Sequence, residues 1–570
     1  MRSRSWRAMA VVGPVLLLAA SSGSVAHASS NVLLVCPTGP ADHPGTTGPT
    51  LTCPAGSYSS IQTAVTAASA GDWVLVAPGD YHETGTVAHP EAGVYITTPN
   101  IHLRGMDRNG VVVDGTNASA SGQCSSATDG QNTNGGAGRN GVEVFKADGT
   151  YIENFTACNY LAGSSGRGNE IWWNGGDGTG TINLNSYWGN YITGTTTFTS
   201  PTNPGQYGIF VSNSRGPGVI TYGYASNMAD SGFYVGACPD CNATLDHVHS
   251  ENNALGYSGT NAGGHLTIKN SEWDNNKAGI VPNSLNNDDA PPPQSGLCPA
   301  STTVSCTFIT GNHVHDNNNP NVPGAGVASA APIGSGIELS GASFNTVDGN
   351  TVDHQNGWGI VIHDYPDTET PPASGVSNCQ GGINGSTPGS PLCTFLSQGN
   401  VVTNNVLSNN GGFGNPTNGD LALESSASNP RNCFSGNTDV GGLTSDPAQI
   451  ETVDGPPCNT PGTGDSGLLL AELVCASGAY VPCPNTGTPP SSYPQSTGVK
   501  LMNMVPQQTM ANPCAGVPDN AWCAAGQLVG PGTNVPEAPL LLLLPLTAVG
   551  AYAIWRRRLF GRRADGPRTA

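Results

Sequence analysis

A glycine followed by an apolar residue recurs at a nearly fixed distance through the middle of this 570-residue chain. The apolar residues stand 23 or 24 positions apart at Phe233, Tyr257 and Ile280, and 23 apart at Ile337 and Ile360. A second pattern recurs in the same units: an apolar residue, two variable positions, a small polar residue, one variable position and another apolar residue. It reads Ile268-x-x-Ser271-x-Trp273, Ile309-x-x-Asn312-x-Val314, Val347-x-x-Asn350-x-Val352 and Val401-x-x-Asn404-x-Val406, with a looser match at Ala243-x-x-Asp246-x-Val248. A period in the twenties predicts a solenoid, in which each unit buries its apolar face only against its neighbours.

The repeating apolar positions are mostly Ile, Val and Phe, and not the regular leucines of a leucine-rich repeat. Short β-branched runs interrupted by Gly and Asn indicate strands and turns. Equivalent strands in successive coils would lie ~4.8 Å apart, so equivalent side chains would form columns. The Asn/Asp/Ser column suits a tight corner, because these side chains bond locally and tolerate a left-handed backbone. The prediction is an all-β, single-stranded parallel β-helix.

These units resemble the right-handed parallel β-helix repeats of the pectin-lyase-like superfamily, including its asparagine ladder, from about Tyr58 to Thr438. The resemblance implies a fold and no single activity, because one fold hosts many functions. The preceding segment places Ile61, Ala64, Val65 and Ala68 on one helical face, and a strand over 73–77 follows it. This arrangement resembles an N-terminal cap, which a solenoid needs to cover the apolar end of its first coil.

The two ends of the chain predict export and anchoring. Residues 1–28 have the basic start, apolar segment and small-residue cleavage site of a signal peptide. A leader over 29–56, the β-helix over 57–455 and a Pro/Gly/Cys-rich stalk or disulfide cap over 456–537 follow. An apolar run over 538–555 predicts a transmembrane helix, and the basic tail over 556–570 marks the cytoplasmic side. This end resembles the Val-Pro-Glu-Pro sorting and anchoring tails of bacterial surface proteins, with Ala538 in place of the second proline.

The charge and the cysteine content limit the classes of partner and indicate where the protein is located. Between Ser29 and Glu537 the chain carries 38 acidic and 10 basic side chains, which argues against nucleic acid as a partner. Sixteen cysteines in an exported protein predict disulfides. Pairing between sequence neighbours is expected, including Cys36 with Cys53, Cys298 with Cys306, Cys379 with Cys393, and Cys514 with Cys523. We expect a monomer at the bacterial cell surface with its body outside.

One outward face carries candidate catalytic and sugar-binding residues. The residue after the first apolar position of each strand points outward, giving a column of Glu143, Phe210, Tyr234, Ser258, Val281, Glu338, Val361 and Ala422. Two residues further along lie Ser340, His363 and Glu424. Candidate catalytic residues are Glu338, His363 and Glu424, with Asp364 at the loop entry, and candidate sugar-stacking residues are Phe210 and Tyr234. Insertions over 282–305 and 366–398 are expected to wall a groove on this face.

The resemblance and this face predict a protein that binds or cleaves polysaccharide, with hydrolase and lyase chemistry both open. Carboxylates two coils apart would be ~9.6 Å apart, near the upper limit for an inverting glycosidase pair. A lyase is poorly equipped, because the only cations between Asn169 and Lys500 are Arg215, Lys269, Lys277 and Arg431. The alternative is a non-catalytic glycan-binding or spacer protein with a merely polar exterior.

A second outward face is rich in histidine and carboxylate. If the coils stack in sequence order, His249, Asp274, His315 and Asp353 form an alternating column. Such a column predicts a divalent cation, zinc-like where histidines dominate and Ca²⁺ where carboxylates do. The alternative is a solvated polar surface. Cys238-Pro239-Asp240-Cys241 near His247 and His249 has the residue types of a zinc site, but a small disulfide is the favoured interpretation in an exported chain.

Overall fold

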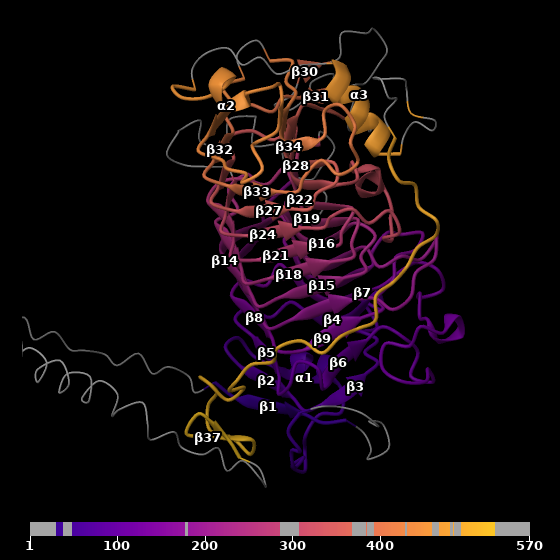
Figure 1. Ribbon diagram of the computed structural model, residues 1–570. Helices are drawn as coiled ribbons and strands as arrows, with labels where there is room; N and C mark the ends of the chain where they lie inside the picture. The colour runs from indigo at the N-terminus through magenta and orange to yellow at the C-terminus, as the bar shows by residue number, and fades with distance from the viewer. Residues whose placement is uncertain are drawn as a thin grey trace, which may run out of the picture.

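The computed structural model describes residues 30–37, 48–176, 180–285, 307–367, 383–384, 393–427, 430–458, 467–478, 483 and 492–529. Within these residues the chain winds through three long sheets of 12, 10 and 11 strands, here called sheets A, B and C (Figure 1). Successive coils add one strand to each sheet, with parallel pairing. The parallel β-helix predicted from the repeat is confirmed.

The three sheets share one coil-by-coil order. Sheet A contains β1 (Val32–Val35), β2 (Trp73–Val76), β5 (His102–Gly105), β8 (Thr150–Glu153), β11 (Leu184–Asn190), β14 (Ser214–Thr221), β17 (Ala243–Asp246), β20 (Leu266–Lys269), β23 (Thr307–Thr310), β26 (Thr346–Asp348), β32 (Val401–Thr403) and β35 (Cys433–Ser435). Sheet B contains β3 (Gly79–Tyr81), β6 (Val111–Asp114), β9 (Thr156–Cys158), β12 (Thr193–Thr195), β15 (Tyr224–Ser226), β18 (His249–Glu251), β21 (Glu272–Asp274), β24 (His313–His315), β27 (Thr351–Asp353) and β33 (Val406–Ser408). Sheet C contains β4 (Ala92–Ile96), β7 (Asn140–Phe145), β10 (Asn169–Asn174), β13 (Tyr207–Ser212), β16 (Ser231–Gly236), β19 (Leu255–Thr260), β22 (Ala278–Asn283), β25 (Ser335–Ser340), β28 (Trp358–His363), β34 (Gly419–Leu423) and β36 (Ser445–Asp446).

The remaining elements cap or decorate the solenoid. They are α1 (Ile61–Ala67), α2 (Ile450–Val453), α3 (Gly467–Ala476), the 3₁₀ turns η1 (Thr128–Gly130) and η3 (Val327–Ala330), a small sheet of β29 (Tyr365–Asp367), β30 (Ile383–Asn384) and β31 (Cys393–Phe395), and a hairpin of β37 (Cys523–Ala524) and β38 (Gln527–Leu528).

Columns of inward side chains form the core. The apolar residues of the glycine triplets pair from coil to coil in sheet C, in the order Ile209, Phe233, Tyr257, Ile280, Ile337, Ile360 and Leu421. All of them are fully buried within one continuous hydrophobic cluster that extends from Val35 to Ile450. The 23-residue period therefore reports one coil of the β-helix.

An asparagine ladder satisfies the polar backbone at the corner between sheets A and B. The Asn350 side-chain oxygen accepts from the Asn312 backbone N–H at 3.0 Å and from its amide at 2.9 Å. Asn405 does the same for Asn350, with both distances at 3.0 Å. The left-handed residue at this corner precedes the ladder residue, as in Gly349 with φ 67° and Asn404 with φ 55°. The Asn/Asp/Ser column was expected to supply the left-handed residue of the turn. Its side chains instead join successive coils by hydrogen bonds.

Two of the sequence matches were wrong in register. Val347 pairs with Val402, so the true unit is Val402-x-x-Asn405-x-Leu407, one residue later than predicted. Both alignments fit the pattern, because Val401 and Val402 are adjacent and so are Asn404 and Asn405. A one-residue slip moves every side chain to the opposite face of the sheet. In the earlier coil Leu245 pairs with Ile268, and Ser250 pairs with Trp273. That unit is two residues later than predicted because its corner position is apolar Val248, where other coils have Ser or Asn.

Both ends of the solenoid are capped. The predicted buried face of α1 is confirmed, and the Glu83 carboxylate accepts from the N–H groups of Ile61 at 2.6 Å and Gln62 at 3.2 Å at the start of the helix. At the other end Ile450 of α2 packs on the core, 1% exposed. The Glu451 carboxylate accepts the backbone and side-chain N–H groups of Asn437, both at 2.8 Å. It thereby satisfies the last donors of the asparagine ladder.

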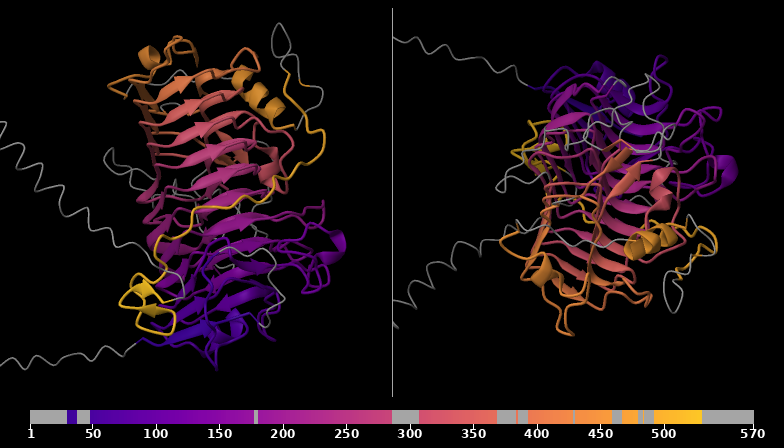
Figure 2. Two further views of the ribbon diagram at one scale, coloured as in Figure 1. Left: turned by 60° about the horizontal axis from the view of Figure 1, so that its bottom comes forward. Right: turned by 90° about the horizontal axis from the view of Figure 1, so that it is seen from above.

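The segment expected to be a stalk or cap returns along the β-helix. Residues 492–529, called the strap below, run from the C-terminal end of the solenoid back to its N-terminal end (Figures 1 and 2). Buried Arg108 donates to the Gln508 carbonyl at 3.0 Å, and Asn252 donates to the Lys500 carbonyl at 3.0 Å. The Trp522 indole donates to the Thr52 carbonyl at 2.8 Å, which fixes the end of the strap beside β1 and β2.

The described cysteines confirm pairing between sequence neighbours. The bonds join Cys36 to Cys53, Cys124 to Cys158, Cys238 to Cys241, Cys433 to Cys458, Cys475 to Cys483, and Cys514 to Cys523. The Cys238–Cys241 bond removes the zinc interpretation of that motif. The predicted Cys298–Cys306 pair, the predicted Cys379 partner of Cys393, the signal peptide, the transmembrane segment and the basic tail lie outside the described residues. No helix among the described residues is long and apolar enough to cross a membrane.

We predict that Asn350→Ala lowers the free energy of unfolding by about 2–4 kcal/mol, because two buried N–H groups of Asn312 lose their acceptor. Urea unfolding followed by circular dichroism measures the change. The exposed neighbour Thr351 provides the control, and Thr351→Ala should change stability by less than ~0.5 kcal/mol. Equal losses in the two variants would show that the ladder does not stabilise the coils.

Candidate ligand-binding groove

The outer face of sheet C forms the floor of a groove of ≈ 420 Å³. Its outward residues come from six successive strands, from Tyr207 on β13 through Tyr234, Ser258, Val281 and Glu338 to His363 on β28. Five strand spacings of ~4.8 Å make the floor about 24 Å long. The predicted outward column is confirmed, except that Trp172 lies between Glu143 and Phe210, and Tyr95 continues the column beyond Glu143.

Two inserted segments form one wall of the groove. The residues after η3 and the exposed side of α3 contribute Ala331, Pro332, Leu470 and Val474. Ala328 of η3 packs on Leu255 and Val281, and α3 covers the apolar outward residues of β28 and β34. The half-buried Lys277 ammonium donates to the Ser329 carbonyl at 2.5 Å and the Ser477 carbonyl at 3.3 Å, and so ties η3 to the end of α3.

The opposite side is contributed by the stems of the two predicted insertions. Leu285, Tyr365 and Pro366 line the groove there. Most of both insertions lies outside the described residues. The described parts of both insertions line the groove, as expected. The wall formed by α3 was not predicted from the sequence.

A buried ion pair lies at the far end of the floor. His363 Nε2 donates to Glu338 Oε1 at 2.9 Å, and His363 Nδ1 lies 2.9 Å from the Asp364 carbonyl. Both ring nitrogens face acceptors, and this arrangement favours the charged form of the imidazole. Burial lowers the pKa of His363, but the hydrogen bond and charge of Glu338 outweigh it and raise that pKa. The second Glu338 oxygen, Oε2, is buried and has no hydrogen-bond partner among the described residues.

The other two candidate carboxylates hold the chain rather than face a ligand. The Asp364 oxygens accept from the Ser397 N–H at 2.8 Å and the Ser426 N–H at 2.7 Å, which joins two loops. Glu424 Oε2 accepts the Asp364 N–H at 3.1 Å, and Glu424 is not among the residues that line the groove. The structure therefore brings Glu338, His363 and Asp364 to the groove and leaves Glu424 behind them.

Asp230 is a groove residue that sequence reasoning missed. It precedes β16 at the opposite end of the groove, and Tyr207 donates its hydroxyl to Asp230 Oδ2 at 2.8 Å. Desolvation raises the pKa of Asp230 to about 7, against the opposing effect of the Tyr207 hydrogen bond. The repeat contains a signal for it. The strand register places Asp230 and Lys277 at equivalent positions two coils apart, so both charged residues belong to one column.

Asp230 and Glu338 cannot act on the same bond. They are three strands apart and four residues apart along the strand direction. With ~4.8 Å between strands and ~3.3 Å per residue, their Cα positions are about 20 Å apart. Paired glycosidase carboxylates are ~5–9.5 Å apart.

The predicted sugar-stacking rings already stack on protein. Phe210 lies parallel to Trp172 at 5.1 Å and to Tyr207 at 4.3 Å between ring centroids. Tyr234 meets Phe210 edge to face at 4.8 Å and lines the groove. Of the two, only Tyr234 is placed to touch a ligand in the groove.

The predicted metal column on sheet B does not form as expected. His249 pairs with Glu272 and not with Asp274, while Asp274, His315 and Asp353 do share one row. The shift follows from the two-residue register error in the coil of β17 and β18. His249 still reaches Asp274 diagonally, with Nε2 2.7 Å from Oδ1. Asp353 instead contacts His313 at 2.9 Å and His354 at 2.6 Å.

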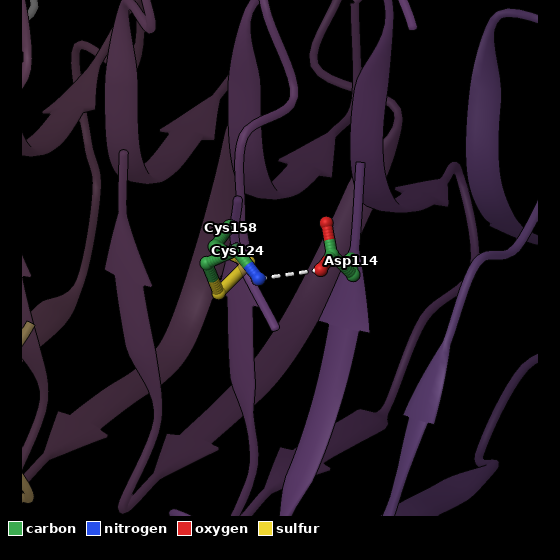
Figure 3. Close-up of side chains that lie close together, drawn as sticks. All are labelled: Asp114, Cys124 and Cys158. Carbon is green, nitrogen blue, oxygen red and sulfur yellow. Dashed lines mark hydrogen bonds between the residues drawn. A yellow bond between two sulfur atoms is a disulfide. The ribbon is translucent and has the colours of Figure 1, made fainter. Parts of the chain in front are cut away.

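A third cluster has metal-ligand residue types but is structural. Asp114, Cys124 and Cys158 lie together on sheet B and its adjoining loop (Figure 3). The two sulfur atoms are bonded to each other, and Asp114 Oδ2 accepts the Cys124 N–H at 2.5 Å. Asp114 Oδ1 accepts from the Thr116 N–H and hydroxyl, both at 2.8 Å, so the carboxylate is already satisfied.

We predict that Glu338→Gln destabilises the protein most at acidic pH. Because the folded pKa of His363 is raised, its stabilising contribution is fully present below about pH 6.5 and is lost as pH rises through the folded value. In the variant the buried imidazolium has lost its counter-charge, so the difference in melting temperature should shrink as pH rises. An NMR titration of His363 should show a lower pKa in the variant. An unchanged His363 pKa would contradict the pairing.

No family model matches the sequence, and no curated protein matches it. Similar solved structures include the A-module of a mannuronan C-5 epimerase of Azotobacter vinelandii, 13% identical with a TM-score of 0.29, covering 66% of this chain and 90% of that one. A pectin methylesterase mutant in complex with a hexasaccharide is 12% identical with a TM-score of 0.31, covering 77% and 99%. The Dettilon tailspike protein is 15% identical with a TM-score of 0.37, covering 73% and 68%. The three long parallel sheets and the asparagine ladder of this chain show that its fold is a parallel β-helix.

Proposed function

We propose that this protein is an exported polysaccharide-binding protein whose sheet C groove holds a linear chain of uncharged sugars. The observation that carries the proposal is the long groove itself, with one carboxylate oxygen buried near its end that has no hydrogen-bond partner in the described part of the chain. A floor about 24 Å long suits a polymer better than a small metabolite. The disulfides of the described residues support an oxidising, extracellular location.

The lining of the groove favours neutral sugars over uronic acids. Hydroxyl and amide groups from Ser258, Thr260, Asn283 and Ser340 alternate with apolar contacts. Sugars present both hydroxyl groups and apolar C–H faces, so such a surface is complementary to them. None of the described lining residues is Lys or Arg, and His363 is already paired with Glu338. Uronate carboxylates would therefore meet Asp230 and Glu338 without a counter-charge.

Cleavage of the bound chain is the second candidate function, and Glu338 Oε2 is the observation that favours it. Glu338 lines the groove and is hydrogen-bonded to His363, and its Oε2 is buried with no hydrogen-bond partner among the described residues. A carboxylate beside a bound ligand can act as a general base or a nucleophile. Asp230 is too distant to serve as the partner acid, so any acid must come from elsewhere.

We predict that the ectodomain binds neutral linear polysaccharides more tightly than uronic-acid polymers in affinity electrophoresis. Glu338→Gln should weaken the neutral complex about tenfold or more, because a hydrogen bond to a charged group contributes about 1.5–3 kcal/mol. Glu272→Gln, on another face, is the matched control and should bind normally. New reducing ends that disappear in Glu338→Gln would add the cleavage function. Preferential binding of uronate polymers would overturn the proposal of neutral ligands.

We also propose that residues 538–555 span the membrane and hold the β-helix on its outer side. The apolar run and the arginines after it support this proposal. Protease treatment of intact cells should release the β-helix and leave a C-terminal fragment in the membrane fraction. Recovery of the intact β-helix from the cytosol would contradict both export and anchoring.

A further inference from the structure

We propose that the outer face of sheet B binds one zinc-type transition-metal cation, with ligands drawn from His249, Glu272, Asp274, His313 and His315. These five residues, called the sheet B cluster below, belong to three consecutive strands, β18, β21 and β24. The register aligns His249, Glu272 and His313 in one row, and Asp274 and His315 in the adjoining outward row. This site lies on a different sheet from the groove and does not depend on the proposed function.

The distances within the cluster suit a shared ion. The ligand atoms of His249, Glu272 and Asp274 lie within 4.8 Å of one another, and so do those of Glu272, His313 and His315. Glu272 belongs to both groups and therefore lies between them. Zinc bonds of ~2.0–2.1 Å in a tetrahedron place ligand atoms roughly 3.3 Å apart. The His315–Glu272 contact at 3.3 Å matches that separation, and the His249–Asp274 hydrogen bond at 2.7 Å would lengthen slightly to admit the ion.

The fold holds the cluster on a rigid base. Between the outward ligands, the inward residues Trp273 and Val314 are fully buried in the core. Binding sites on strands keep their geometry better than sites on loops, because packing fixes the backbone. The backbone of the three strands therefore holds each group of ligands at a fixed spacing.

Neighbouring carboxylates orient two of the histidines. Asp353 Oδ2 lies 2.9 Å from His313 Nε2, and Asp316 Oδ2 lies 3.0 Å from His315 Nδ1. Metal-binding histidines commonly give one ring nitrogen to a carboxylate while the other faces the metal. The predicted ligand Asp353 thus becomes a supporting residue, and Glu272 and His313, absent from the predicted column, take places among the ligands.

The types of ligand residue in the sheet B cluster indicate which metal ion would bind. Three imidazoles with two carboxylates suit zinc and its neighbours in the first transition row, whereas Ca²⁺ takes oxygen ligands. The cluster is open to solvent, since the side chains of His313 and Glu272 are 49% and 51% exposed. An ion can therefore enter without a change of fold, and removing one ligand should leave the core intact.

Isothermal titration of the purified full-length protein with ZnCl₂ and with CaCl₂ tests the proposal. We expect one Zn²⁺ per chain and at least tenfold weaker Ca²⁺ binding. The variants Glu272→Gln and His315→Ala should each weaken Zn²⁺ binding by more than about tenfold, with unchanged circular dichroism. His265→Asn is the control, since it removes an exposed histidine near Asp240 while Asn tolerates the left-handed backbone at φ 58°.

Substitution of Co²⁺ for Zn²⁺ gives an independent readout, because its visible spectrum reports ligand number and type. The spectrum should be lost in Glu272→Gln and retained in the groove variant Glu338→Gln, which separates this proposal from the one about polysaccharide. Absence of stoichiometric Zn²⁺ binding would overturn the proposal. So would Zn²⁺ affinity that is unchanged in both cluster variants, or Ca²⁺ affinity equal to that for Zn²⁺.

Discussion

The structure depends on hydrogen bonds that run from each coil to the next. In a parallel β-helix every strand between the end coils is paired on both sides, and the corners are the places where backbone groups would lose their partners. Asn312, Asn350, Asn405 and Asn437 remove that penalty at the corner between sheets A and B. A further series, Asn253, Asn276 and Asn317, does the same between sheets B and C. The coil length is therefore fixed, and variation is confined to loops and to outward side chains.

The coil spacing explains which features could be predicted from the sequence. Inward positions repeat because each side chain must fit the equivalent side chains above and below it, so the columns of sheet C were predictable. Register errors arose where one coil departs from the pattern, as at Val248, or where two readings overlap, as at Val401 and Val402. Outward columns inherit those errors, which is why His249 was aligned with Asp274 although it pairs with Glu272.

The wall of the groove and the strap were beyond a repeat-based prediction. Helix α3 packs on Val361 and Ala422, outward residues whose apolar character is a sign that something covers them. The contacts of the strap join residues as distant as Arg108 and Gln508, and they use backbone carbonyls that leave no mark on composition. Asp230 was missed for a related reason, because the pKa of this half-buried carboxyl is raised by desolvation, which no neighbouring residue in the sequence signals.

The strap also changes how the solenoid holds together. In a repeat protein each unit contacts only its neighbours, so the end coils can unfold while the middle stays folded. Here the strap bonds to Asn415 near the last coils, to Asn252 and Asn227 in the middle, and to Arg108 in the first coils. Opening an end coil therefore requires release of contacts made by a segment that also holds distant coils. The strap therefore makes the unfolding of the two ends interdependent.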